Sequence, residues 1–138
     1  MVPSRQGTRA RRASTVGQIL VVEDDSDIRM WMLSALDATG HVVSVAADGA
    51  EGLTALDAVE RPCLVFLDLL MPELDGVGFL SALSERGDRD QFTVVVMSAL
   101  PGAEQAVRRF SSVVRVLSKP LGLKTILPLV EQYCSPAS

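Results

Sequence analysis

Five short apolar runs, each followed by a segment with helical periodicity, constrain most strongly what this chain can fold into. The runs cover residues 18–22, 41–47, 63–69, 92–99 and 113–119. Most are continuously apolar, which is typical of strands in a parallel sheet whose two faces are both covered by helices. Strand and helix patterns that alternate five times predict an α/β fold, a doubly wound (βα)5 parallel sheet.

Several residues indicate where the helices begin and end. Asp25 or Ser26 is expected to cap the first helix. Asp48, with Glu51 three residues later, forms a capping-box pattern for the second helix, and Pro62 ends that helix. These signals place each helix between two of the apolar runs.

The last helix is expected to turn one apolar stripe toward the sheet. The members of this stripe are Leu123, Ile126, Leu127, Val130, Tyr133 and Cys134. Pro128 falls off the stripe and removes one backbone donor, so we expect a mild kink there and no functional role.

Charge is unevenly distributed along the chain. Residues 1–17 contain four arginines and no acid, and they have no apolar periodicity. We therefore predict a disordered basic arm over 1–17 and one domain over 18–138. Because the formal net charge of the whole chain is −4, the domain is more acidic still. Such a balance argues against nucleic acid as the main partner.

The cysteine content and the hydropathy indicate in which cellular compartment the protein resides. Cys63 and Cys134 are the only cysteines and lie in no metal-ligand pattern, so two reduced thiols are expected. No apolar run approaches the roughly 18 residues that span a bilayer, and the basic start lacks the apolar stretch of a signal peptide. These features predict a soluble cytoplasmic protein with no membrane partner.

Polar residues stand at the ends of four of the apolar runs. The first run is followed by Glu23 and Asp24, the third contains Asp68, the fourth Ser98 and the fifth Lys119. In a parallel sheet these ends meet at one edge, where ligands bind. Clustered carboxylates without His or Cys make a hard oxygen site suited to Mg²⁺. An amine and a hydroxyl nearby are donors that suit a phosphoryl group.

Each of these residues also has a structural interpretation when it is taken alone. The acidic run 23–25 often serves only to cap a helix and to compensate its dipole. Ser98 alone is an ordinary strand-end hydroxyl, and Lys119 alone is a solvated amine. The combination is far more specific, because four strand ends deliver an acid pair, an acid, a hydroxyl and an amine in that order.

In these residues the chain resembles the CheY-like receiver domain of two-component response regulators. The resemblance extends from Gln18 to about Tyr133 and rests on the motifs ILVVEDD, DLLMPELDG, VVVMSAL and VLSKP. It implies a flavodoxin-like sheet of strand order 2-1-3-4-5. It also implies a signalling domain that catalyses only its own phosphorylation and dephosphorylation, and not an independent enzyme.

The resemblance further implies a role for each strand-end residue. Asp68 would be the phosphoacceptor, with Ser98 and Lys119 contacting the phosphoryl group. The positions that match the Mg²⁺-binding set of the family are Glu23, Asp24, Asp68 and Leu70, the last through its backbone carbonyl. The peptide bond between Lys119 and Pro120 is typically cis in this family.

Partners follow from the same resemblance. A sensor histidine kinase or a histidine phosphotransfer protein would supply the phosphoryl group from a phosphohistidine. The sequence shows no DNA-binding pattern after the receiver motifs. We therefore expect output through contact with a downstream protein target, with no direct DNA binding.

The sequence departs from the family at two positions. Val116 stands where Tyr or Phe is frequent, and Leu121 where Phe is frequent.

Two other classes of protein come into question. A pseudo-receiver that only docks, without phosphorylation, is disfavoured because every phosphorylation residue is present. A phospho-aspartyl phosphatase would need an aspartate two residues after Asp68, and Leu70 occupies that position.

Overall fold

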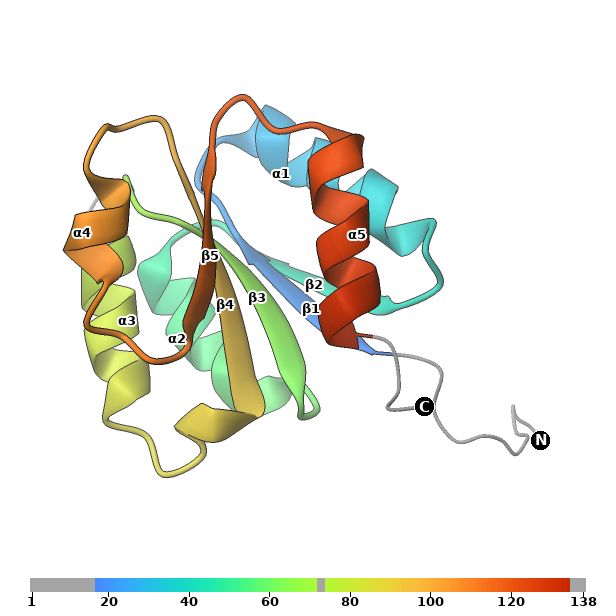
Figure 1. Cartoon of the computed structure of the whole chain (residues 1–138). Coiled ribbons are helices and arrows are strands. Elements are labelled where there is room, and N and C mark those ends of the chain that lie inside the picture. Colours follow the sequence, from blue (N-terminus) through green and yellow to red (C-terminus); the bar gives the residue numbers. More distant parts are fainter. Residues whose placement is uncertain (1–16, 72–73, 135–138) are drawn as a thin grey trace.

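Strands and helices alternate along the chain in the computed structural model, which describes residues 17–71 and 74–134 (Figure 1). The strands are β1 (Gln18–Val22), β2 (Val42–Ala46), β3 (Cys63–Asp68), β4 (Phe92–Ser98) and β5 (Val113–Ser118). The helices are α1 (Ser26–Asp37), α2 (Gly49–Ala58), α3 (Gly76–Ser84), α4 (Ala103–Val107) and α5 (Leu123–Cys134), with a 3-10 helix η1 (Arg89–Gln91). The basic arm predicted over 1–17 lies, apart from Gly17, outside the described residues.

All five strands form one parallel sheet in the order β2-β1-β3-β4-β5, which confirms the predicted class and strand order. Val22, the last residue of β1, lies beside Ala46 of β2 and Leu67 of β3. Asp68 ends β3 beside Met97 of β4. Since the strands run in the same direction, their carboxyl ends meet at one edge of the sheet.

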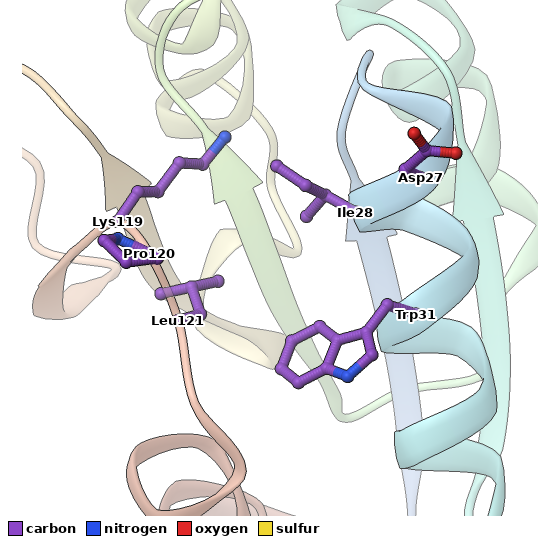
Figure 2. A pocket seen from close by; sticks show the side chains of 6 residues that line it. All are labelled: Asp27, Ile28, Trp31, Lys119, Pro120 and Leu121. Atoms are coloured by element: carbon purple, nitrogen blue, oxygen red, sulfur yellow. The ribbon is translucent and has the colours of Figure 1, made fainter.

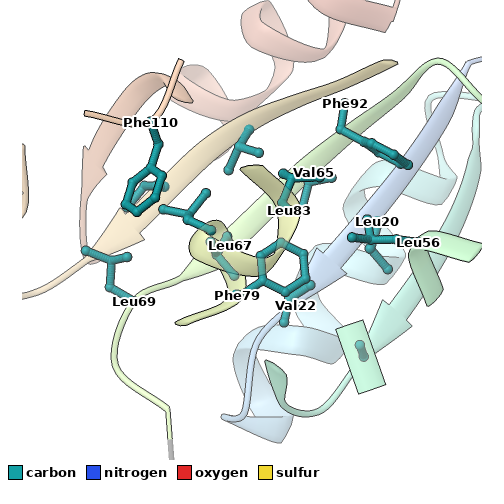
Figure 3. Packing of buried hydrophobic residues seen from close by; sticks show 14 of the residues in the cluster. Leu20, Val22, Leu56, Val65, Leu67, Leu69, Phe79, Leu83, Phe92 and Phe110 are labelled. Carbon is teal, nitrogen blue, oxygen red and sulfur yellow. The ribbon is translucent and has the colours of Figure 1, made fainter. Parts of the chain in front are cut away.

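Helices cover both faces of the sheet, with α1 and α5 on one face and α2, α3 and α4 on the other (Figure 1). Alternate residues of β1 therefore enter different cores. Leu20 and Val22 face α2 and α3, where Phe79 is buried among them (Figure 3), whereas Ile19 and Val21 face α1 and α5. Burial on both sides explains why the strands read as continuous apolar runs.

Capping residues start the helices as the sequence indicates. The Asp25 Oδ1 atom accepts from the N–H groups of Asp27 and Ile28 at 2.9 and 3.1 Å, so Asp25 is the cap of α1. Asp48 caps α2 by accepting from Glu51 N at 2.8 Å. The Glu51 carboxylate reaches back to the N–H of Ala47 at 2.9 Å, one residue before the cap.

The apolar stripe predicted for α5 is wrong in part. Ile126 and Val130 are buried as predicted, but Leu123 and Leu127 are 44% and 37% exposed. Leu129, which was not among the predicted residues, is buried. The helix is thus rotated so that the i, i+3, i+4 set at 126, 129 and 130 faces the sheet.

Helix α4, with five residues, is the shortest of the described α-helices. It ends at Val107, and the next turn is broken where Phe110 donates its N–H to Val107 O at 3.0 Å. Phe110 is buried in the core beneath α3 and α4, and the Arg109 guanidinium covers its ring at 4.3 Å. Burying this aromatic ring takes precedence over continuing the helix.

Gly76 begins α3 in close contact with the end of β3. A Cβ atom at this position would lie 2.6 Å from Leu69 Cα and 2.7 Å from the carbonyl oxygen of Asp68. Both are backbone atoms, which cannot rotate away as a side chain can. The N–H of Gly76 also donates to Leu69 O at 2.9 Å. Residue 76 therefore sets how closely α3 approaches the strand end that carries Asp68.

Replacing Gly76 with alanine is expected to destabilise the fold by about 1–3 kcal/mol, the usual cost of overpacking. The measurement is thermal or urea unfolding followed by circular dichroism. Gly87→Ala is the matched control, because Gly87 is exposed and a Cβ there meets no atom within 4 Å. Equal stability of the two variants would contradict the prediction.

Candidate functional site

Residues from the ends of four strands converge at the carboxyl edge of the sheet. Glu23 and Asp68 are buried, 0% and 3% exposed, and Ser98 is 3% exposed. The Lys119 Nζ atom donates to Glu23 Oε1 at 2.9 Å and lies 3.4 Å from Asp68 Oδ1. Lys119 follows β5 and Glu23 follows β1, so the lysine side chain reaches across the ends of β4 and β3.

The three acids form a cluster of the size that a metal ion needs. One oxygen atom from each of Glu23, Asp24 and Asp68 lies within 4.8 Å of the other two. All donors are hard carboxylate oxygens, the ligands that Mg²⁺ prefers. Asp24 is exposed, which leaves one side open for the water ligands that Mg²⁺ retains. The residues present therefore fit Mg²⁺, with Asp24 at the solvent side.

Burial and crowding shift the ionisation of the site. Burial, and then the neighbouring charge of Glu23, raises the pKa of Asp68 to about 7, although Lys119 opposes this shift. Burial alone would lower the pKa of Lys119, but the Glu23 and Asp68 carboxylates outweigh it and raise that pKa. The ammonium group is thus held charged, while Asp68 is poised between its two protonation states near neutral pH.

The loops after β3 and β4 fold back on the residues that precede them. The N–H of Leu70 donates to Asp68 Oδ1 at 3.2 Å, and the N–H of Leu100 donates to Ser98 Oγ at 3.0 Å. The Leu70 and Leu100 side chains are 64% and 50% exposed, although both are apolar. Two exposed apolar side chains therefore follow Asp68 and Ser98, each at a distance of two residues. A metal contact through the Leu70 carbonyl stays a prediction.

A shallow groove continues from the acidic pocket between α1 and the loop before α5 (Figure 2). It has a volume of about 260 Å³. Its lining residues are Asp27, Ile28, Trp31, Lys119, Pro120 and Leu121. Trp31 is 38% exposed and lines this groove. The peptide bond between Lys119 and Pro120 is cis, as the resemblance implies.

One residue of this site was missed in the sequence analysis. The Arg29 guanidinium, on the second turn of α1, donates to the carbonyl oxygens of Glu23 and Asp24. A cationic side chain five or six residues after an acidic pair was the available signal. That spacing alone does not distinguish an inward-folded arginine from a solvated one.

A sequence profile described as response regulator receiver domain matches residues 19–131. An uncharacterized 14.6 kDa protein from Leptolyngbya boryana is 34% identical over 118 residues, which cover 84% of this chain and 88% of that protein. With five parallel strands in the order described and an acidic pocket at their carboxyl ends, the chain belongs to the response regulator receiver domain family.

Solved structures are similar to this fold. Chemotaxis protein CheY4 from Vibrio cholerae matches with a TM-score of 0.76 at 23% identity, over 85% of this chain and 98% of that one. Response regulator protein TrrA from Thermotoga maritima, solved in complex with Mg²⁺-BeF, matches with a TM-score of 0.73 at 19% identity, over 85% and 98%. At these identities the likeness shows the fold.

Other curated relatives are longer than this chain. The match spans 33% of one probable transcriptional regulator and 47% of one response regulator. The matched region is therefore less than half of each relative. Among the residues that the structure describes, no helix is long and apolar enough to cross a bilayer.

The raised pKa of Asp68 predicts a pH-dependent stability in the metal-free protein. Because the folded state holds this proton more tightly than the unfolded state, stability falls as pH rises from about 4 to about 7, and the full cost remains above pH 7. We expect Asp68→Asn to be more stable than the parent at pH 8, by about 1–3 kcal/mol, with the gain vanishing near pH 4.

Urea unfolding in EDTA at pH 4, 6 and 8 measures this difference. Asp90→Asn is the control, since Asp90 is exposed in η1, before the amino end of β4. A gain for Asp68→Asn that does not change between pH 4 and pH 8 would contradict the assignment.

Proposed function

We propose that this receiver domain accepts a phosphoryl group on Asp68, in a Mg²⁺-dependent reaction, from the phosphohistidine of a histidine kinase or a histidine phosphotransfer protein. Phosphorylation would then be read by a downstream protein through contact. The domain would extend over 18–138, with the basic arm outside it. The proposal rests on one observation above all: a buried aspartate at a strand end, with two further acids and a lysine around it.

Each residue has a task that its position supports. Asp68 is the nucleophile, and its carboxylate attacks the phosphorus while the phosphorus–nitrogen bond to the donor imidazole breaks and the imidazole leaves. Lys119, 3.4 Å from Asp68 Oδ1, neutralises charge on the transferred group. Glu23, Asp24 and the Leu70 carbonyl would hold Mg²⁺, which when bound offsets the repulsion between the anionic partners.

Ser98 connects the site to the rest of the domain. Its hydroxyl accepts from Leu100 N at 3.0 Å, so its own proton is free to be donated elsewhere. Donation to a phosphoryl oxygen on Asp68 would draw Ser98 and the loop that leads into α4 toward the site. Such an ordering of loop and helix by new phosphate contacts is a recurrent form of signalling switch.

Mg²⁺ with beryllofluoride, a mimic of the phosphoryl group, is expected to bind the parent protein and not Asp68→Asn. Trp31 lines the groove that shares Lys119 with the site, so its fluorescence should report binding. Calorimetry measures the same event without relying on the tryptophan. No heat from a folded parent sample at millimolar Mg²⁺ would overturn the proposed function and favour a docking module that is not phosphorylated.

Transfer itself is tested by mixing the protein with labelled phosphorylated histidine kinases. Label should appear on the parent and be lost in Asp68→Asn and in the presence of EDTA. Asp90→Asn, altered at the opposite edge of the sheet, should accept label as the parent does. Label that persists on Asp68→Asn would contradict the assignment of the acceptor.

The phosphoryl group on Asp68 is expected to hydrolyse slowly. Water must approach in line with the phosphorus. The exposed side chains two residues after Asp68 and Ser98 are Leu70 and Leu100, which cannot hydrogen-bond that water. A polar pair there would orient the water, a gain of roughly 1–3 kcal/mol in the transition state, or about ten- to a hundredfold in rate.

The experiment compares the rate at which labelled phosphoprotein loses its label between the parent and a Leu70→Asn, Leu100→Glu double variant. The matched control replaces two leucines that are exposed on α5, Leu123→Asn with Leu127→Glu. The prediction fails if the variant at the site loses its phosphoryl group no faster than the parent.

A further inference from the structure

Arg29 binds the backbone of the turn that carries two of the three clustered acids. Its Nη1 atom donates to the carbonyl oxygen of Glu23 at 2.9 Å and to that of Asp24 at 3.3 Å. One guanidinium nitrogen thus bridges two successive carbonyls. Among the described residues, no other side chain donates to either oxygen. The side chain is half-buried against this turn.

The two acids of this turn are held in different ways. Glu23 is fixed at both carboxylate oxygens, since Oε1 accepts from Lys119 and Oε2 from the N–H of Asp25 at 3.1 Å. The Glu23 N–H also donates to Ala46 O at 3.1 Å. In the described part of the chain, the Asp24 carboxylate has no hydrogen bond or ion pair. The direction of the Asp24 side chain therefore depends on the backbone that Arg29 holds.

We infer that Arg29 is a positioning residue for the magnesium site, acting on Asp24 through the main chain. The inference rests on the proposed function, because it requires Mg²⁺ at the acidic cluster. Removing the guanidinium leaves two carbonyl oxygens without this donor and lets the turn relax. The Asp24 carboxylate is then no longer held within reach of the other two acids, and the ion loses a preorganised ligand.

The sign of the effect distinguishes positioning from simple electrostatics. A guanidinium near the cluster repels a bound cation, so deleting the charge alone would strengthen Mg²⁺ binding. Loss of the two hydrogen bonds that hold the turn would instead weaken Mg²⁺ binding. Residues that orient a metal ligand typically contribute 10–100-fold in affinity, and we expect about tenfold here because Asp24 is one ligand of several.

The experiment measures the Mg²⁺ dissociation constant by calorimetry for the parent and for Arg29→Met, which keeps the aliphatic stem and loses every donor. Arg29→Lys tests rescue, since an ammonium group can reach one of the two carbonyls. Arg108→Met is the matched control, because Arg108 is exposed and caps the carboxyl end of α4. We expect about tenfold weaker binding for Arg29→Met, a smaller loss for Arg29→Lys and none for the control.

A second readout separates affinity from chemistry. With phosphoramidate as donor, the Mg²⁺ concentration for half-maximal labelling of Asp68 should rise for Arg29→Met, while the rate at saturating Mg²⁺ stays near that of the parent. Melting in EDTA establishes that the variants are folded. Should Arg29→Met not fold, Arg29→Gln takes its place in both measurements.

Two results would overturn the inference, and only the second would also overturn the proposed function. A folded Arg29→Met or Arg29→Gln variant that binds Mg²⁺ as tightly as the parent, or more tightly, removes the role of Arg29 and leaves the proposed function intact. A parent protein that binds no Mg²⁺ removes both.

Discussion

The ion pair between Lys119 and Glu23 is the contact on which the site depends. Glu23 is wholly buried, and a buried carboxylate without a partner would cost several kcal/mol. The lysine that compensates it comes from 96 residues further along the chain, at 2.9 Å. The same ammonium group lies 3.4 Å from Asp68. One cation therefore serves two buried acids, and the cluster keeps an excess of negative charge that a metal ion can balance.

Parallel topology makes this convergence inevitable once the strands are in place. Four polar strand ends, separated by dozens of residues, reach one edge because the strands point the same way and lie in adjacent positions. That geometry depends only on the direction and order of the strands. The fold class and the strand order could therefore be predicted from the apolar runs and the family motifs, and the acids, Ser98 and Lys119 could be named as candidates from the sequence.

Features that depend on side-chain direction could not be predicted in this way. The stripe of α5 could be predicted only in part, because Leu123, Leu127 and Leu129 are equally apolar in sequence and only packing decides which of them is buried. Arg29 was missed because an arginine on the first turns of a helix is usually solvated. Its direction follows from the path of the acidic turn, which no periodicity encodes.

The two edges of the sheet have opposite electrostatic character. Before the amino end of β4, Arg86 donates two hydrogen bonds of 2.8 and 3.0 Å to the Asp88 carboxylate. Arg61 donates to the same carboxylate at 2.9 Å. The guanidinium groups of both arginines lie over the Phe92 ring. Hydrogen bonds from Arg86 and then Arg61 hold the pKa of Asp88 well below its usual range. Charges there are matched and the contacts are structural. At the carboxyl edge, acids outnumber the one lysine, and burial, followed by the neighbouring charge of Glu23, raises the pKa of Asp68 instead. The fold thus matches its charges at one edge of the sheet and leaves them unmatched at the other. Reactivity is concentrated at the unmatched edge, because a cation or a phosphoryl group changes the charge balance most there.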